Sequence, residues 1–140
     1  MVENPHPTIS VLFIDGNKND REYWARQLRM CSPDFVVLEA VDGRSGLALI
    51  QSQQVDCVVV ELSLPDMYGF EVLLNLVSRA KKPEMAVVIL TRLVFPGLAE
   101  LAFSNGALGY LTKSQSSVDE LDKVIRKAIA AVGPNKHRQP

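Results

Sequence analysis

Short apolar runs alternate along the chain with segments whose apolar residues recur at the spacing of a helix. The runs at 55–60 and 85–90 are rich in valine and isoleucine and barely alternate with polar residues. This pattern is typical of strands that are covered on both faces of a sheet. All the runs that predict strands lie at residues 9–14, 35–41, 55–60, 85–90 and 107–111.

Each apolar run is followed by a segment that predicts a helix. Apolar residues at i, i+3, i+4 and i+7 form one face of such a helix. The segment 43–52 carries the weakest pattern. Asn17 is expected to cap the first helix, and Ser116 or Ser117 the last. The residues expected on buried helix faces are Trp24, Leu28 and Cys31; Phe70, Leu73, Leu74 and Val77; Leu98, Leu101 and Ala102; and Leu121, Val124, Ile125 and Ala128.

This alternation predicts an α/β fold. Strands that are each followed by a helix form a parallel sheet when the crossovers are right-handed, with helices on both faces. The length of 140 residues suits one such domain. We expect the domain at residues 9–132, a flexible leader at 1–8, and a flexible tail or the start of a linker at 133–140.

Composition narrows the class of protein without indicating its activity. The formal net charge of −1 gives no reason for this domain alone to bind nucleic acid. No apolar run approaches the roughly 20 residues of a membrane span, and the first residues lack a signal-peptide pattern. We therefore expect a cytoplasmic protein without membrane contact. Its two cysteines, Cys31 and Cys57, are expected to be buried free thiols.

Polar residues stand at the carboxyl ends of four predicted strands: Asp15, Glu61, Thr91 and Lys113. Open α/β sheets bind ligands in the crevice at this edge. Taken singly, Asp15 and Thr91 have ordinary explanations as caps or turn residues, and Lys113 as an exposed lysine. Glu61 is harder to explain by packing, because a carboxylate directly after a buried run needs a partner or water. Together the four residues predict one site.

Four stretches, in this order, resemble response-regulator receiver domains: VLFIDGN, VVVELSLPDMYGFEVL, VVILTRL and GALGYLTKS. The resemblance extends over residues 9–132. It implies a flavodoxin-like fold, that is, a doubly wound (βα)5 parallel sheet of five strands in the order 2-1-3-4-5. In that family an aspartate after the third strand accepts a phosphoryl group from a histidine kinase. Acids after the first strand bind Mg²⁺ with it, and a hydroxyl and a lysine contact the phosphoryl oxygens.

The resemblance assigns four positions to the phosphoryl group and the metal. Asp15 matches the first acid, and Glu61 occupies the phosphoacceptor position. Ser63 would offer its backbone carbonyl to Mg²⁺. Gly16 stands where a second acid is usual, so any Mg²⁺ site would be weak. The longer side chain of Glu61 displaces the carboxylate by roughly 1.5 Å, and a misplacement of about 1 Å can lower a rate about a hundredfold.

Three further positions match the residues that respond to phosphorylation. Thr91 matches the switch hydroxyl, Lys113 the lysine, and Tyr110 the aromatic residue that turns inward on activation. With these retained, the sequence favours a degenerate receiver that signals without ordinary phosphorylation. Glu61 would pair with Lys113 or Thr91 and hold an active-like arrangement permanently. Such a domain acts through contacts with signalling proteins and is not expected to be an enzyme.

Two other interpretations remain open. One is slow phosphorylation of Glu61 by a histidine kinase. The other is a dimerisation or binding module without a switch, which would use the fourth helix, the fifth strand and the last helix, around residues 98–105 and Tyr110. A small enzyme of similar topology, such as a flavin protein, is disfavoured because the first turn carries an acid and no glycine-rich phosphate loop.

Overall fold

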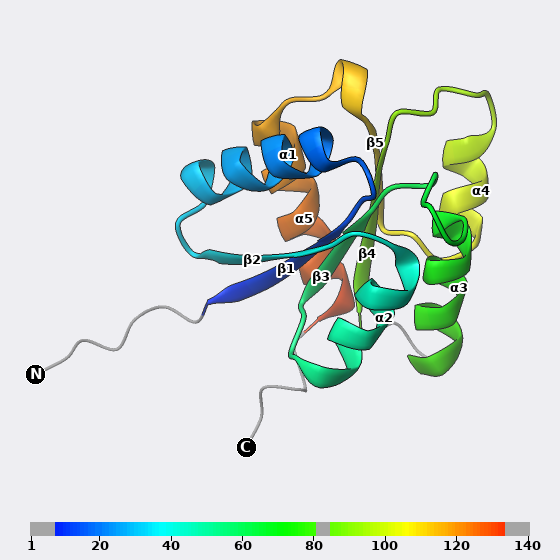
Figure 1. Cartoon of the computed structure of the whole chain (residues 1–140), viewed down its shortest axis with the longest axis horizontal. Helices are drawn as coiled ribbons and strands as arrows, with labels where there is room; N and C mark the ends of the chain where they lie inside the picture. The colour runs from blue at the N-terminus through cyan, green and yellow to red at the C-terminus, as the bar shows by residue number, and fades with distance from the viewer. Residues whose placement is uncertain (1–7, 81–84, 134–140) are drawn as a thin grey trace, which may run out of the picture.

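The computed structural model describes residues 8–80 and 85–133. Within them, five parallel strands form one sheet in the order β2-β1-β3-β4-β5, which confirms the expected order (Figure 1). Of the predicted leader and tail, all but Thr8 and Gly133 lie outside the described residues. The strands are β1 (Ile9–Ile14), β2 (Phe35–Ala40), β3 (Cys57–Val60), β4 (Ala86–Thr91) and β5 (Gly109–Thr112).

Helices cover both faces of the sheet. Figure 1 shows α1 and α5 on one face and α2, α3 and α4 on the other. In the described part of the chain, none of these helices has both the length and the apolar character needed to cross a membrane. The helices are α1 (Lys18–Cys31), α2 (Gly43–Ser52), α3 (Gly69–Ala80), α4 (Leu98–Ser104), the 3₁₀ turn η1 (Lys113–Gln115) and α5 (Val118–Val132).

Two apolar layers hold the helices to the sheet. Successive side chains of β1 serve opposite layers, because side chains alternate across a strand. Val11 and Phe13 lie in the layer under α1 and α5, and Leu12 and Ile14 lie in the layer under α2, α3 and α4. Every residue of β3 and β4 is buried. Burial on both faces explains why the sequence of these two strands barely alternates.

The buried faces of α3 and α4 differ from the predicted ones. Leu74 and Val77 of α3 and Leu101 of α4 are exposed, although their spacing placed them in the core. Apolar residues occur on more than one side of these helices, so periodicity alone does not select the face that meets the sheet. Among the described side chains of the two helices, the buried apolar ones are Val72, Leu73, Leu76 and Ala102.

Cys31 is exposed, so the prediction of two buried thiols is wrong for this residue. It is the last residue of α1, where the chain leaves the core, and its thiol lies 3.4 Å from a carboxylate oxygen of Asp119. Cys57 is buried as predicted, and both cysteines are free. Burial raises the pKa of the Cys57 thiol, which keeps it protonated and unreactive.

The predicted helix caps are present. The side chain of Asn17 accepts a hydrogen bond from the backbone N–H of Asp20 at 2.9 Å at the start of α1. At the start of α5, Ser117 rather than Ser116 is the cap, and it forms a reciprocal capping box with Glu120. Both caps lie at the edge of the sheet where the strands end, so they fix the two helix starts that border this edge.

Candidate functional site

The polar residues that follow the strands lie together at the carboxyl edge of the sheet. The register pairs Ile14 with Val60 and Val60 with Ile89, so these strands reach the edge at the same level. Hydrogen bonds and ion pairs then join the side chains of all four predicted residues, Asp15, Glu61, Thr91 and Lys113.

Lys113 occupies the centre of the site. Its ammonium nitrogen lies 2.7 Å from Asp15, 2.8 Å from Glu61 and 2.9 Å from Asp20. The lysine side chain is only 8% exposed, and a buried ammonium requires such partners because an unpaired buried charge is costly. Burial by itself lowers the pKa of Lys113, but the hydrogen bonds to the three carboxylates raise it further than burial lowers it. The ammonium is therefore charged at neutral pH.

Glu61 accepts hydrogen bonds from four donors. The Thr91 hydroxyl and the backbone N–H of Ser63, at 3.1 Å, donate to Oε2. Lys113 and the backbone N–H of Arg92, at 3.2 Å, donate to Oε1. Burial raises the pKa of Glu61, but the hydrogen bonds from Lys113 and Thr91 outweigh burial and lower the pKa below its ordinary value. The carboxylate is thus ionised and fixed in one position.

Asp20 and Arg92 belong to the site, although the sequence analysis did not select them. Asp20 lies in the first turn of α1, and its two oxygens accept hydrogen bonds from the Arg92 guanidinium at 2.9 and 3.2 Å. These bonds, together with Lys113, lower the pKa of Asp20. The available signals were the place of Asp20 three residues after the cap Asn17, and that of Arg92 directly after Thr91.

Gly16 has little space for the acid that the family resemblance places there. A Cβ atom at this position would lie 2.7 Å from both Cγ and Cδ of Pro65, and 3.2 Å from the carbonyl oxygen of Val41. Carbon atoms that are not bonded rarely approach this closely, so the proline ring would have to shift. The missing acid is therefore coupled to close packing between the loop after β3 and the turn after β1.

This arrangement does not fit a divalent cation. Within residues 8–80 and 85–133, no group of three or more acid, histidine or cysteine side chains is placed to hold a metal ion. One oxygen of Asp15 accepts from the N–H of Asn17 and the other from Lys113, and both oxygens of Glu61 are engaged. Mg²⁺ needs oxygen ligands at about 2.0–2.1 Å. The predicted Mg²⁺ site consists of Asp15, Glu61 and Ser63. The ammonium of Lys113 contacts the carboxylates of Asp15 and Glu61 and so occupies the place of the metal ion.

Tyr110 packs inward on the face of the sheet that α4 covers. It is partly buried against the apolar cluster that includes Ile89 and Ala102. Burial and the negative charge of Glu61 raise the pKa of the phenol, so Tyr110 is a neutral hydroxyl at any physiological pH. The side chain therefore belongs to the apolar layer on the face of the sheet that α2, α3 and α4 cover.

Asp15 and Glu61 share Lys113 but differ in the direction of their pKa shifts. Burial raises the pKa of Asp15, and the hydrogen bond with Lys113 offsets only part of this effect. The charge of Glu61 raises it further. Glu61 has more donors, so its charged form is favoured while that of Asp15 is not. As the pH falls, we expect Asp15 to take up a proton before Glu61.

We expect Glu61→Gln and Asp15→Asn to change stability differently at neutral pH. A carboxyl group with a lowered pKa stabilises the fold above its ordinary pKa, and this stability is lost as the pH falls through the lowered pKa. Glu61→Gln should therefore lower the free energy of unfolding by roughly 1–3 kcal/mol. A raised pKa has the opposite effect on stability, because the ionised form of Asp15 is disfavoured in the folded state. Asp15→Asn should therefore leave the free energy of unfolding unchanged or raise it.

Urea denaturation of both variants and the wild type measures this difference. At neutral pH, Glu61→Gln should have a lower free energy of unfolding than the wild type. Asp15→Asn should have the same free energy of unfolding as the wild type or a higher one. Well below the ordinary carboxyl pKa of about 4, the loss from Glu61→Gln should shrink. Equal losses for the two substitutions at neutral pH would contradict the assignment of the ionised carboxylate to Glu61.

Comparison with known proteins shows the family. Residues 11–126 match the model of the response regulator receiver domain. The chain belongs to this family. Two curated relatives of this receiver domain are the transcriptional regulatory protein UhpA of Salmonella typhimurium and the nitrate/nitrite response regulator protein NarL of Escherichia coli.

The receiver domain spans little more than half the length of these relatives. It is 35% identical to UhpA over 114 residues, which cover 81% of this chain and 55% of UhpA. It is 31% identical to NarL over 130 residues, which cover 92% of this chain and 58% of NarL.

Solved structures of receiver proteins have the same fold. A response regulator receiver domain protein from Clostridium thermocellum superposes with a TM-score of 0.78 at 26% identity, over 88% of this chain and 95% of that one. A LuxR-family two-component response regulator from Aurantimonas gives a TM-score of 0.78 at 29% identity, over 89% and 86%. The receiver domain therefore has the architecture of two-component response regulators.

Proposed function

We propose that this receiver domain signals without ordinary phosphorylation, with Glu61 as a constitutive acid at the phosphoacceptor position. The observation that supports the proposal is the set of contacts made by its carboxylate. Glu61 already binds Thr91 and Lys113, the hydroxyl and the ammonium that the family resemblance assigns to the phosphoryl oxygens. A fixed carboxylate thus supplies negative charge to the groups that otherwise respond to a phosphoryl group.

The contacts of Glu61 also oppose phosphoryl transfer. An attacking carboxylate must present a free oxygen in line with the phosphorus atom. The side chain of Glu61 is only 4% exposed, and both of its oxygens accept hydrogen bonds. Attack would require Glu61 to leave Lys113 and Thr91, and the site offers no place for Mg²⁺ while the ammonium of Lys113 stands among the acids.

The site is connected to an apolar surface that a signalling partner can bind. The Thr91 hydroxyl accepts a hydrogen bond from the backbone N–H of Leu93 at 3.1 Å, so the Glu61–Thr91 contact fixes the start of the loop after β4. We propose that this loop and α4 carry the signal through protein contacts. The large apolar residues exposed there are Val94, Phe95, Leu101 and Phe103.

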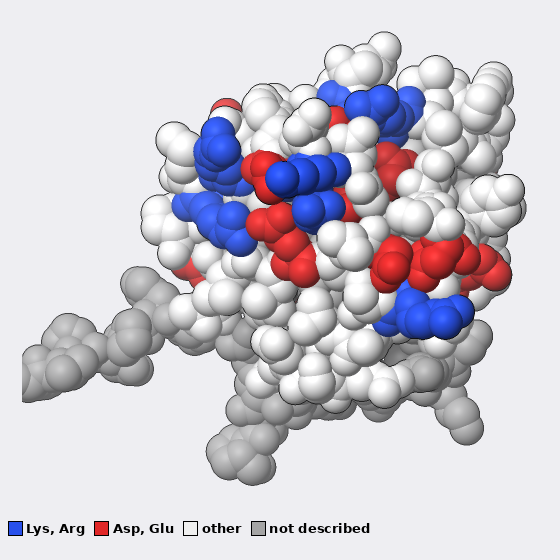
Figure 2. Space-filling model, in the orientation of Figure 1, with Lys and Arg blue, Asp and Glu red and all other residues white. Residues whose placement is uncertain are grey.

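The charge distribution gives no reason to propose nucleic acid as the partner of this domain. Figure 2 shows basic and acidic side chains interspersed on the face in view, rather than separated into areas of one sign. A nucleic-acid backbone is bound by clustered lysine and arginine residues. We therefore propose other signalling proteins as partners, a histidine kinase among them.

The test is incubation with Mg²⁺ and a small phosphodonor, followed by measurement of the intact mass. We expect no stoichiometric phosphoryl adduct, and we expect beryllofluoride with Mg²⁺ to leave the NMR signals of Thr91 and Tyr110 unchanged. A base-labile adduct on the wild type that is absent from Glu61→Gln would instead support slow phosphorylation of Glu61. That result would overturn the proposal.

The exposed apolar residues of α4 favour a second candidate, a dimerisation module without a switch. Leu101 is 48% exposed and Phe103 50%, beside the partly buried Tyr110 of β5. In this candidate, α4, β5 and α5 form the contact between two copies. Sedimentation that shows a monomer at high protein concentration would exclude it, and a dimer that Phe103→Glu dissociates would support it.

A further inference from the structure

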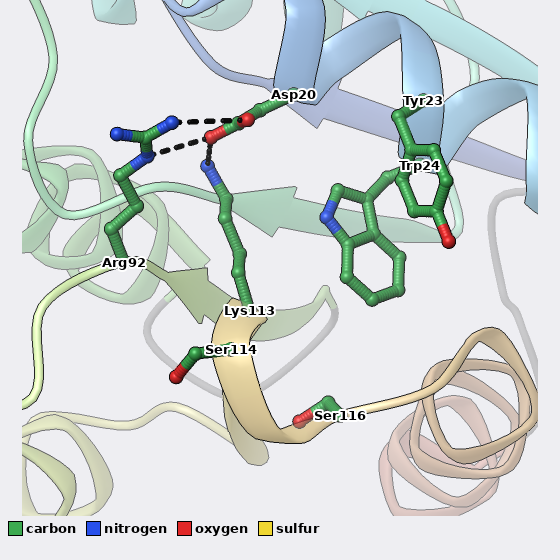
Figure 3. A pocket seen from close by; sticks show the side chains of 7 residues that line it. All are labelled: Asp20, Tyr23, Trp24, Arg92, Lys113, Ser114 and Ser116. Carbon is green, nitrogen blue, oxygen red and sulfur yellow. Dashed lines mark hydrogen bonds and ion pairs between the residues drawn. The ribbon is translucent and has the colours of Figure 1, made fainter.

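An open pocket of about 460 Å³ lies beside the site, at the same edge of the sheet (Figure 3). Small-molecule sites commonly have volumes of roughly 300–1,000 Å³. We propose that this pocket binds a small organic anion, with one carboxylate joined to a compact apolar body. The residues that line it and carry the proposal are Tyr23, Trp24, Arg92, Ser114 and Ser116.

Arg92 supplies the positive charge for the carboxylate. Its side chain is 62% exposed, whereas that of Asp20, its partner in the ion pair, is 20% exposed. Because the guanidinium is open to solvent and Asp20 has Lys113 as a second partner, a ligand carboxylate can take the place of Asp20 on the guanidinium. The same two-bond geometry is available to either carboxylate. Asp20 would keep its contact with Lys113 at 2.9 Å.

Three hydrogen-bond donors on the pocket wall are not used by the fold. The indole N–H of Trp24 and the hydroxyls of Ser114 and Ser116 make no hydrogen bond to another residue of the described ranges. In the same ranges, every buried polar side-chain atom has a partner. The indole N–H must therefore reach solvent, although Trp24 is only 6% exposed. Free donors favour a ligand that carries oxygen acceptors.

The aromatic residues provide an apolar wall beside these donors. Tyr23 is 54% exposed, and its ring meets the ring of Trp24 edge to face, with the centroids 5.4 Å apart. In Figure 3, the indole of Trp24 and the side chains of Arg92 and Lys113 stand on opposite sides of the pocket. A ligand with an apolar body removes the Tyr23 ring from water, which an inorganic anion cannot do.

Occupation of the pocket would reach the loop after β4. Arg92 donates its backbone N–H to Glu61 and its side chain to Asp20. A ligand that takes over the guanidinium therefore changes the contacts that hold this loop, next to the exposed residues Val94 and Phe95. The binding itself does not depend on the proposed function, whereas a role of the ligand as the input signal rests on it.

Fluorescence of Trp24 tests the proposal directly, because Trp24 is the only tryptophan of the chain. Benzoate should change the emission saturably at millimolar concentrations. Benzamide has the same ring without the charge, and acetate has the charge without the ring, so both should bind at least about tenfold more weakly. Arg92→Gln should weaken benzoate binding by about tenfold. Arg26→Gln, on an exposed arginine of α1 outside the pocket, should leave binding unchanged.

A linear change of emission that is the same in the wild type and in Arg92→Gln would overturn the proposal. An equal response to acetate and benzoate would mean a general effect of anions, and would overturn it as well. The phosphodonor experiment distinguishes this failure from failure of the proposed function. If benzoate does not bind, the wild type should still form no phosphoryl adduct. If Glu61 is phosphorylated by the phosphodonor, the benzoate titration of the untreated protein should be unchanged.

Discussion

Replacing Lys113 with methionine should lower the free energy of unfolding by about 3–5 kcal/mol, because a buried charge cluster loses the cation at its centre. Methionine fills much of the same volume but leaves three carboxylates facing one another, those of Asp15, Asp20 and Glu61. Urea denaturation at neutral pH measures the loss. Protonation removes the repulsion between the acids, so the difference from the wild type should shrink as the pH falls.

Three comparisons separate this electrostatic effect from a packing defect. Lys127→Met, on an exposed lysine of α5, should change stability by less than about 0.5 kcal/mol. Adding Glu61→Gln to Lys113→Met should restore part of the loss, since one of the repelling charges is gone. Mg²⁺ should stabilise Lys113→Met but not the wild type, because only in the variant are the carboxylates of Asp15, Asp20 and Glu61 without the ammonium that occupies their centre. A Lys113→Met variant as stable as the wild type would contradict the described site.

The triple variant Gly16→Asp, Glu61→Asp, Pro65→Ala should form a stoichiometric phosphoryl adduct with a phosphodonor and Mg²⁺, where the wild type forms none. Glu61→Asp withdraws the carboxylate from Thr91 and Lys113 by one methylene and leaves space for a phosphoryl group. Gly16→Asp adds the second acid for the metal. Pro65→Ala removes the ring atoms that would lie 2.7 Å from the new Cβ. Intact mass before and after treatment at high pH measures the adduct.

The double variant that retains Pro65 is the matched control. Because the new side chain would meet the proline ring, this variant should be less stable and should give a lower yield of adduct than the triple variant. Equal yields would mean that the loop after β3 moves freely. A folded triple variant without any adduct would mean that the acids at positions 16 and 61 do not limit the reaction.

The strands could be predicted from the sequence because two of the inner ones, β3 and β4, are covered on both faces. Burial of every residue in β3 and β4 leaves continuous apolar runs that are rich in valine and isoleucine. The helix faces were harder, since Leu74, Val77 and Leu101 are apolar and yet exposed. Their exposure depends on how α3 and α4 are rotated against the sheet, which the spacing of residues within one helix does not determine.

The residues of the site also differ in how far the sequence could predict their positions. Asp15 and Glu61 directly follow strands of one parallel sheet and Thr91 ends another strand, so the order of strands is sufficient to bring them together. Asp20 and Arg92 reach the site from a helix turn and a loop, and their contact depends on the path of both segments in space. The proximity of Pro65 to Gly16 likewise depends on the path of two loops in space. The sequence alone therefore could not predict it.

One apolar layer joins the two ends of the domain. Val11 and Phe13 of β1 lie in the same cluster as Leu121 and Ile125 of α5. During translation, the β1 residues emerge from the ribosome first, and α1 can cover them only in part before α5, at 118–132, has followed. A nascent chain stalled before residue 118 should therefore present a partly uncovered sheet face to chaperones. This apolar layer is complete only after α5 has been synthesised.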